Sequence, residues 1–192
     1  GAGGGTLVAA LALGTLARTG PVTWQLPHAA NLVLRQLGIL IFLACAGLLG
    51  FGLYLQHSMG LAPCPMCILQ RYAFVATGVA ALAAAIHNPA GAGRWGYGLM
   101  TVIAAGFGGG VAIRHVYLEH HPPQIFDCGA DLSFMMDSFP LAEALPMIFR
   151  GTGDCTKVLW RFLGLSIAEW ALIWFAMFII AAVVATTLRP RR

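Results

Sequence analysis

The sequence predicts an all-α membrane protein, a polytopic bundle of four helices. Hydrophobic residues make up 59% of the 192 positions and charged residues only 9%, whereas soluble domains carry about a quarter charged residues. The mean hydropathy is +0.79. Four stretches without acidic residues approach the roughly 20 residues that a helix needs to cross a bilayer. Lipid offers no hydrogen-bond partner to backbone groups, so these stretches should be helical.

The expected spans are residues 37–55, 68–86, 95–113 and 170–188, and only the second contains a charge, Arg71. Gly106 and Gly110 form a small-xxx-small pair, which predicts close helix packing in the third span. We expect residues 35–192 to form the membrane domain. Residues 1–34 are treated as a peripheral segment without an assigned role, because their apolar run is too short to span.

Charged residues predict the orientation in the membrane. All seven acids lie between residues 119 and 169, whereas Arg18, Arg35, Arg94 and the arginines after residue 188 stand in segments without acids. Lysine and arginine mark short cytoplasmic connections. Both termini should therefore be cytoplasmic, and two loops, about residues 56–67 and 114–169, should face outward. Residues 139–149 of the long loop have amphipathic spacing, which suits either a short interfacial helix or simple loop packing.

Four of the five cysteines fall in the outward loops, where disulfides persist. Cys64 and Cys67 are in the first loop, and Cys128 and Cys155 are in the second. Cys45 lies in the middle of a span and is expected to act as a small hydrophobic residue.

A Cys-x-x-Cys motif is typical of a redox pair, half of a zinc site or a haem attachment site. Haem attachment requires histidine after the second cysteine, and position 68 is isoleucine. A structural zinc site would need a closed set of four protein ligands. The four outward cysteines offer that number, although Cys128 and Cys155 lack the usual short spacing, and no metal is expected.

The residues around the motif favour redox chemistry. Pro65 suits the first turn of a helix, so Cys64 should cap that helix and Cys67 should lie in its first turn. Unpaired N–H groups and the helix dipole favour a thiolate there. Arg71, four residues later on the same face, adds a positive charge. A charged residue at the edge of a span is a functional candidate, although Arg71 could instead reach the lipid headgroups.

The segments "QHSMGLAPCPMCILQRYAF" and "FDCGADLSFMMDSFPLAEALPMIFRGTGDCTKVLWRFLGLSIAEW" resemble the DsbB family of disulfide-forming proteins of the bacterial inner membrane. The resemblance covers about residues 36–188. It implies that a DsbA-like periplasmic protein of thioredoxin fold gives electrons to the Cys128–Cys155 pair, with Cys128 forming the mixed disulfide.

The resemblance further implies exchange between Cys155 and Cys64, and delivery by Cys67 to a membrane quinone, with ubiquinone expected before menaquinone. Arg71 matches the arginine that supports quinone binding. His115 lies thirteen residues before Cys128, where a family histidine near the quinone falls; a histidine at a headgroup boundary needs no catalytic role. A DsbA–DsbB–quinone chain keeps the bacterial periplasm oxidising. No nucleic acid partner is expected.

Three other classes of protein remain as alternatives. A non-catalytic membrane subunit would hold the cysteines as structural disulfides. A haem bundle would need histidines facing each other inside the helices, and most of them cluster at span ends. A vitamin K epoxide reductase-like enzyme also couples thiols to quinones, but its Cys-x-x-Cys motif usually lies near the last span.

Overall fold

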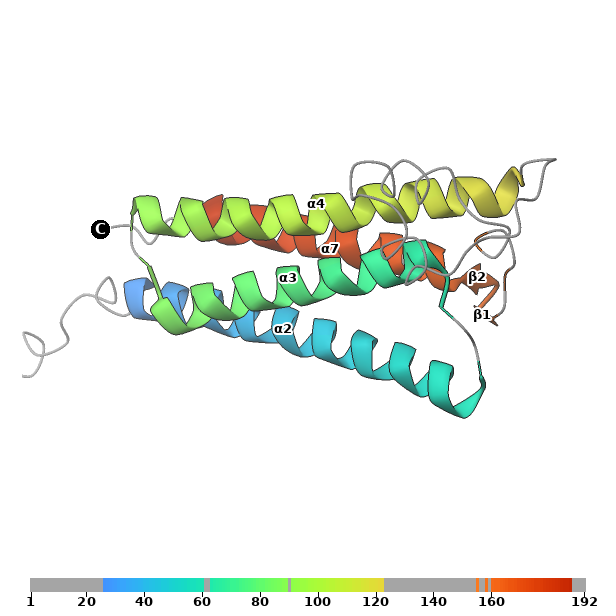
Figure 1. The fold of residues 1–192 in the computed structure, drawn as a ribbon. Helices are drawn as coiled ribbons and strands as arrows, with labels where there is room; N and C mark the ends of the chain where they lie inside the picture. Colours follow the sequence, from blue (N-terminus) through green and yellow to red (C-terminus); the bar gives the residue numbers. More distant parts are fainter. Residues whose placement is uncertain are drawn as a thin grey trace, which may run out of the picture.

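The computed structural model describes residues 26–60, 63–89, 91–122, 155, 158 and 160–187, with side chains from residue 35 onward. Within these residues the chain forms four helices and one short hairpin (Figure 1). The helices are α2 (Leu26–Ser58), α3 (Pro65–His87), α4 (Ala92–His120) and α7 (Ile167–Thr187), and the strands are β1 (Arg161–Phe162) and β2 (Leu165–Ser166). The predicted all-α four-helix membrane fold is confirmed. Cys128 and the expected interfacial helix at 139–149 lie outside the described residues.

The four helices lie side by side with alternating direction (Figure 1). α3 packs against α2 and α4, and α4 packs against α7, whereas α2 and α7 touch each other little. Ser58, Pro65, His120 and Ile167 stand at one end of the bundle, which we call the cysteine end because it carries the Cys-x-x-Cys motif. Leu26 and Thr187 stand at the opposite end.

The bundle exposes many large apolar side chains and buries many alanines at its helix contacts, as expected for helices in lipid. Leu40, Leu99, Ile103 and Ile180 are each about 60% exposed. All four helices are long and apolar enough to cross a membrane. The chain is therefore a multi-pass membrane protein.

All four helices extend beyond the spans predicted from the sequence, and α2 and α4 do so by seven residues or more at one end. α4 does not end at Ile113 but continues to His120, and Arg114 lies over the ring of Tyr117 at 5.4 Å from its centroid. The predicted span ended at Ile113 because Arg114 is the next charged residue, but the helix continues past Arg114. α2 begins at Leu26, inside the segment that was expected to be peripheral. The domain boundary at residue 35 stays a prediction.

A hairpin sets the start of α7. Leu163 and Gly164 form its turn with positive φ angles of 52° and 83°, the backbone region of tight hairpin turns. Ser166 and Glu169 then form a capping box: the Glu169 N–H donates to Ser166 Oγ (3.2 Å), and the Ser166 N–H donates to Glu169 Oε2 (2.7 Å). This "SIAE" pattern was a helix-start signal that the sequence interpretation missed.

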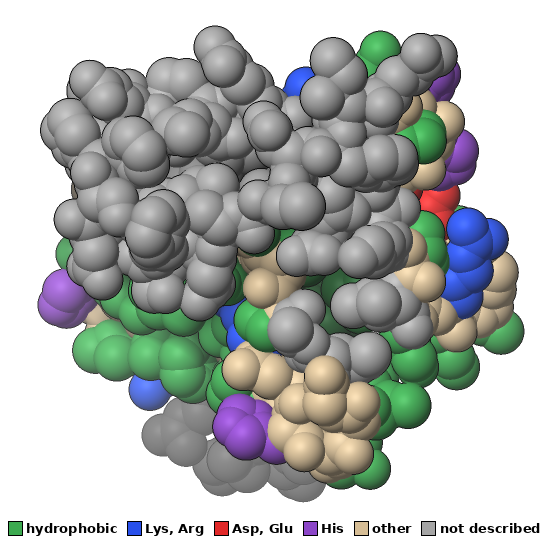
Figure 2. All heavy atoms as spheres, turned by 45° about the vertical axis from the view of Figure 1, so that its right-hand side comes forward, with side chains coloured by type: hydrophobic (Ala, Val, Ile, Leu, Met, Phe, Trp, Pro, Cys, Tyr) green, Lys and Arg blue, Asp and Glu red, His purple; other side chains and the backbone are tan. Residues whose placement is uncertain are grey.

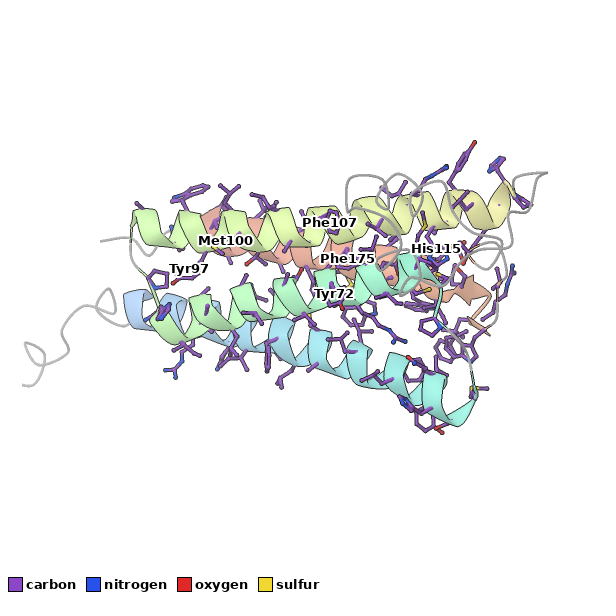
Figure 3. All side chains as sticks on the ribbon, in the orientation of Figure 1. Tyr72, Tyr97, Met100, Phe107, His115 and Phe175 are labelled. Carbon is purple, nitrogen blue, oxygen red and sulfur yellow. The ribbon has the colours of Figure 1, made fainter. Side chains whose placement is uncertain are left out.

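A glycine allows close packing at Gly108, where α4 meets both α3 and α7. A Cβ atom at Gly108 would stand 2.3 Å from Phe175 Cζ and 2.8 Å from Ala73 Cβ. Phe175 is fully buried and stacks on Phe74 with ring centroids 4.2 Å apart; Figure 3 shows it between the helices. The expected packing role of Gly106 and Gly110 is wrong, because both are exposed and a Cβ atom at either position would meet nothing within 4 Å.

Gly108→Ala should destabilise the bundle by about 1–3 kcal/mol, the usual cost of overpacking a core. Thermal unfolding in detergent, followed by circular dichroism, measures the change. Gly106→Ala and Gly110→Ala are matched controls on the same helix and should leave the unfolding temperature unchanged or slightly higher. Equal effects at all three positions would contradict this packing arrangement.

Candidate functional site

The Cys-x-x-Cys motif begins α3 as expected. Cys64 is the N-cap residue and Pro65 occupies the first helical turn. The Cys67 N–H donates to Cys64 Sγ at 3.2 Å. The thiol pair is thus held at the positive end of the helix dipole, which favours negatively charged sulfur.

Three cysteine side chains meet at this point. Cys64 Sγ lies 2.7 Å from Cys67 Sγ, and the Cys64 thiol also forms a hydrogen bond with Cys155. Cys64 and Cys155 are buried, whereas Cys67 is half-buried. Cys64 therefore stands between a sulfur of its own motif and a sulfur from the long loop, the position needed to exchange with either one.

The two thiols of the motif should differ in reactivity. Hydrogen bonds to Cys155 and to Cys67, together with burial, raise the pKa of the Cys64 thiol above its usual range. A raised pKa keeps the thiol protonated through neutral pH, and the thiolate is the nucleophile. We therefore expect Cys67 to be the sulfur of the reduced pair that reacts as a nucleophile with a ligand in the cavity.

In reduced protein, iodoacetamide at neutral pH should modify Cys67 well before Cys64. As the pH rises, modification of Cys64 should increase, because its thiol ionises only under alkaline conditions. Timed alkylation followed by peptide mass spectrometry gives both rates. Equal modification of Cys64 and Cys67 at neutral pH would contradict the assignment.

Arg71 points back toward α2. Its Nη1 donates to Gln56 Oε1 at 2.7 Å and its Nη2 donates to the Gly52 carbonyl at 3.1 Å. Neither partner carries a charge, and within the described part of the chain no carboxylate forms an ion pair with Arg71. The guanidinium is close enough to Cys67 for an electrostatic interaction with its sulfur. Its positive charge is thus available to a thiolate or to the oxygen of a ligand.

His115 reaches the cysteines because α4 continues beyond the predicted span, and Figure 3 shows it on α4 beside the start of α3. The residue is 4% exposed. Its Nε2 lies 3.7 Å from Cys64 Sγ, and its Nδ1 lies 3.3 Å from the amide nitrogen of Gln70. A hydrogen bond also joins the ring to the backbone of Cys155. The imidazole is therefore part of the thiol site.

An apolar cavity of about 630 Å³ opens beside these groups, within the range of small-molecule sites. Its polar wall includes Cys67, Arg71 and His115. Its apolar wall combines side chains from α2 and α7 with residues before α7: Leu48, Leu49, Phe51, Leu55, Trp160, Trp170 and Trp174. Such a cavity suits a flat lipophilic ligand with oxygen atoms at one end.

Figure 2, turned so that the right-hand side of Figure 1 comes forward, shows the surroundings of the cysteine end. Single basic, acidic and histidine side chains are scattered among hydrophobic ones over the described part of this face.

Metal binding is less well supported by the geometry. Ligand atoms of Cys64, Cys67 and His115 all lie within 4.8 Å of one another. Tetrahedral zinc with bonds of about 2.3 Å holds two sulfurs roughly 3.8 Å apart. The 2.7 Å between the two sulfurs suits a pair that forms a bond with each other.

The predicted site residues Cys64, Cys67, Arg71 and His115 line one cavity. Cys155 does not line it but forms a hydrogen bond with Cys64 beside it. Cys45 lies apart from them in the apolar core.

The sequence interpretation missed Gln70, which contacts His115, and Glu119, which lines the cavity. Helical spacing was the available signal, since Gln70 stands one turn after Cys67 and Glu119 one turn after His115.

Comparison with known families agrees with this geometry. Residues 34–185 match the family described as disulfide bond formation protein DsbB. The chain belongs to the DsbB family. It is similar to disulfide bond formation protein B of Aromatoleum aromaticum, with 54% identity over 149 residues, 78% of this chain and 90% of that protein. It is 54% identical to the protein of the same description from Azoarcus sp. over 141 residues, 73% and 85% of the two chains.

A third DsbB relative, from a Polaromonas species, is 48% identical over 159 residues, 82% of this chain and 94% of that protein. The family and the cysteine site together identify a membrane thiol oxidase that forms disulfides. The alternative of a non-catalytic subunit with structural disulfides does not agree with this membership.

Proposed function

We propose that the chain reoxidises a DsbA-like dithiol protein of the periplasm and passes the electrons through two cysteine pairs to a membrane quinone. The observation that carries the proposal is the juxtaposition of Cys67, Arg71 and His115 on one wall of an apolar cavity. A redox pair that served water-soluble partners alone would need no lipophilic cavity beside it.

The two cysteine pairs act in sequence. A thiolate of the reduced partner attacks Cys128 of the Cys128–Cys155 disulfide, forms a mixed disulfide and releases Cys155 as a thiolate. The Cys155 thiolate attacks Cys64 of the Cys64–Cys67 disulfide and releases Cys67, supported by the hydrogen bond between Cys155 and Cys64. The partner's second thiol then displaces Cys128 and leaves the partner oxidised, and Cys128 attacks Cys155, which reforms the Cys128–Cys155 disulfide. Cys64 and Cys67 are left reduced, and their reoxidation returns the chain to its starting state.

The quinone accepts two electrons and two protons when it is bound. Arg71 would hold one of its oxygens, because the guanidinium reaches the cavity with no acidic partner among the described residues. Cys67 faces the cavity as the electron donor, and Nε2 of His115 lies 3.7 Å from Cys64 Sγ, beside the reacting sulfurs. The apolar walls limit the access of water to the reacting sulfurs. Ubiquinone is proposed first, and menaquinone offers the same carbonyl oxygens.

The driving force requires such an acceptor. A DsbA-type dithiol has a potential of about −120 mV, and each 30 mV corresponds to about 1.4 kcal/mol for two electrons. An ordinary structural disulfide has a reduction potential below about −300 mV. Oxidation of the DsbA-type dithiol by such a disulfide would therefore be unfavourable by about 8 kcal/mol.

The proposed location is the bacterial inner membrane, with the cysteine end in the periplasm and both termini in the cytoplasm. The distribution of arginine and acidic residues supports this orientation. Labelling of single cysteines placed near residues 60 and 90 with an impermeant reagent would test it, and labelling only near residue 90 from outside would contradict it.

Quinone reduction tests the function itself. Purified protein in detergent, given a reduced thioredoxin-fold dithiol protein and excess quinone, should oxidise one dithiol for each quinone reduced. Cys45→Ser is a matched control because Cys45 is buried away from the cavity, and it should keep the wild-type rate. A dithiol protein that stays reduced while quinone is present would refute the proposal.

A further inference from the structure

Glu119 is a buried carboxylate beside the site that neither disulfide exchange nor quinone holding employs. Its side chain is only 7% exposed, and it lines the cavity from the last turn of α4. Burying a carboxylate in a membrane-spanning helix is costly, and such residues mark functional sites and proton relays. Its contacts therefore need an explanation.

The two oxygens of Glu119 face different elements. Oε1 lies 3.8 Å from Nε2 of His115, and Oε2 accepts a hydrogen bond of 2.6 Å from the hydroxyl of Ser166. The first oxygen thus faces the thiol site and the second faces the start of α7. One carboxylate connects the two.

Beyond Ser166, contacts through its backbone N–H lead to the more exposed side chains of Glu169 and His120. The Ser166 N–H donates to Oε2 of Glu169, whose side chain is 25% exposed. Oε1 of Glu169 lies 4.0 Å from Nε2 of His120, whose side chain is 58% exposed. The charged and titratable groups that face Glu119 are His115 and His120 on its own helix, Arg161 on β1 and Glu169 on α7.

Gln70 sets which nitrogen of His115 carries the proton. The amide nitrogen of Gln70 can only donate, so Nδ1 of His115, at 3.3 Å, accepts. The proton of the neutral ring is therefore on Nε2, the atom near both Cys64 Sγ and Glu119 Oε1. Any proton that His115 gives up leaves from Nε2, and Glu119 is placed to return it there.

The redox chemistry requires such a return. Oxidation of the Cys64–Cys67 dithiol forms one S–S bond and releases two electrons and two protons, and reduction of quinone to quinol takes up two of each. A thiol that reacts as thiolate has already lost its proton to water. At least one proton per turnover must then come back from water to a cavity with mostly apolar walls.

We propose that Glu119 is the proton-relay residue of this site. It takes up protons from water at the mouth of the cavity and passes them to Nε2 of His115 once that nitrogen has given up its own proton, while the Ser166 hydroxyl holds the other carboxylate oxygen. This inference rests on the proposed function. It adds a route for protons to the route already proposed for electrons.

The first test measures two half-reactions of Glu119→Gln. Glutamine keeps an oxygen that can accept the hydrogen bond from Ser166, so this contact is retained while the carboxyl group that could carry a proton is lost. Quinone reduction should slow by about 100-fold, the lower part of the range for general acid catalysis. The rate should fall about tenfold per pH unit above neutrality, because His115 then depends on protons arriving from water. Thiol exchange with the partner, measured without quinone, should stay within about twofold of wild type.

Two further variants separate a relay from a packing role. Glu119→Asp should recover most of the rate, and formate should restore Glu119→Ala without affecting wild type. A structural tie would not respond to formate.

A second readout needs no quinone. In quinone-free protein, an infrared carboxyl C=O band should change when the cysteines are reduced, and that band should be missing from Glu119→Gln.

The proposal is overturned by an unchanged rate and pH profile in Glu119→Gln, by equal losses in both half-reactions, by a lack of formate rescue, or by a carboxyl band that reduction leaves unchanged. Wild-type protein that fails to reduce quinone at all would instead refute the proposed function. The two failures are thus distinguishable.

Discussion

Cys67→Ser should lower quinone reduction by at least about a thousandfold, the scale of loss when a nucleophile is removed. Cys67 is the half-buried sulfur of the pair and faces the cavity, whereas Cys64 is buried between Cys67 and Cys155. Serine keeps the size and the helix start but cannot form a disulfide. The relay would therefore stop once the Cys128–Cys155 disulfide has been reduced.

The measurement is the initial rate of quinone reduction with a reduced thioredoxin-fold protein as donor. The variant should still react once with the donor, because reduction of the Cys128–Cys155 disulfide does not need Cys67. Sustained turnover in Cys67→Ser would mean that electrons leave from another sulfur.

Arg71→Met should raise the quinone concentration needed for half-maximal rate by about 10- to 100-fold. The hydrogen bonds of a charged group contribute about 1.5–3 kcal/mol, and 1.4 kcal/mol corresponds to tenfold. Methionine retains much of the side-chain length but removes the guanidinium that contacts Gln56 and the cavity. The maximal rate should change less than the half-saturating concentration.

Arg35→Met is the matched control, since Arg35 is an exposed arginine on α2, far along that helix from the cysteine end. It should behave as wild type. An Arg71→Met variant with an unchanged quinone requirement would show that the arginine serves the lipid headgroups or the packing of α2.

The helices and the thiol pair were predictable because their signals are local. Hydropathy marks each span, and the spacing of Cys64, Pro65 and Cys67 describes a helix start that the structure confirms. The four-residue step from Cys67 to Arg71 places both on the cavity wall.

Other features depend on how the helices are rotated against each other. Gly106, Gly108 and Gly110 look alike in the sequence, but only Gly108 of these three faces Phe175. Hydropathy also ended the third span before His115, and the continued helix brings His115 and Glu119 to the cysteines. From the sequence, Glu119 looks like an acidic residue of a loop, and its burial follows only from the extension of α4 to His120.

The central claim is that the quinone occupies the cavity beside Cys67, and photo-crosslinking tests it most directly. A light-activated azidoquinone added to the purified protein, followed by peptide mass spectrometry, should label the α2 residues 48–56 and the α7 residues 170–174 that contribute to the cavity wall. Unmodified quinone should compete with that labelling. Labels confined to the opposite end of the bundle, around His87 and Tyr97, or labels that quinone does not displace, would contradict the account.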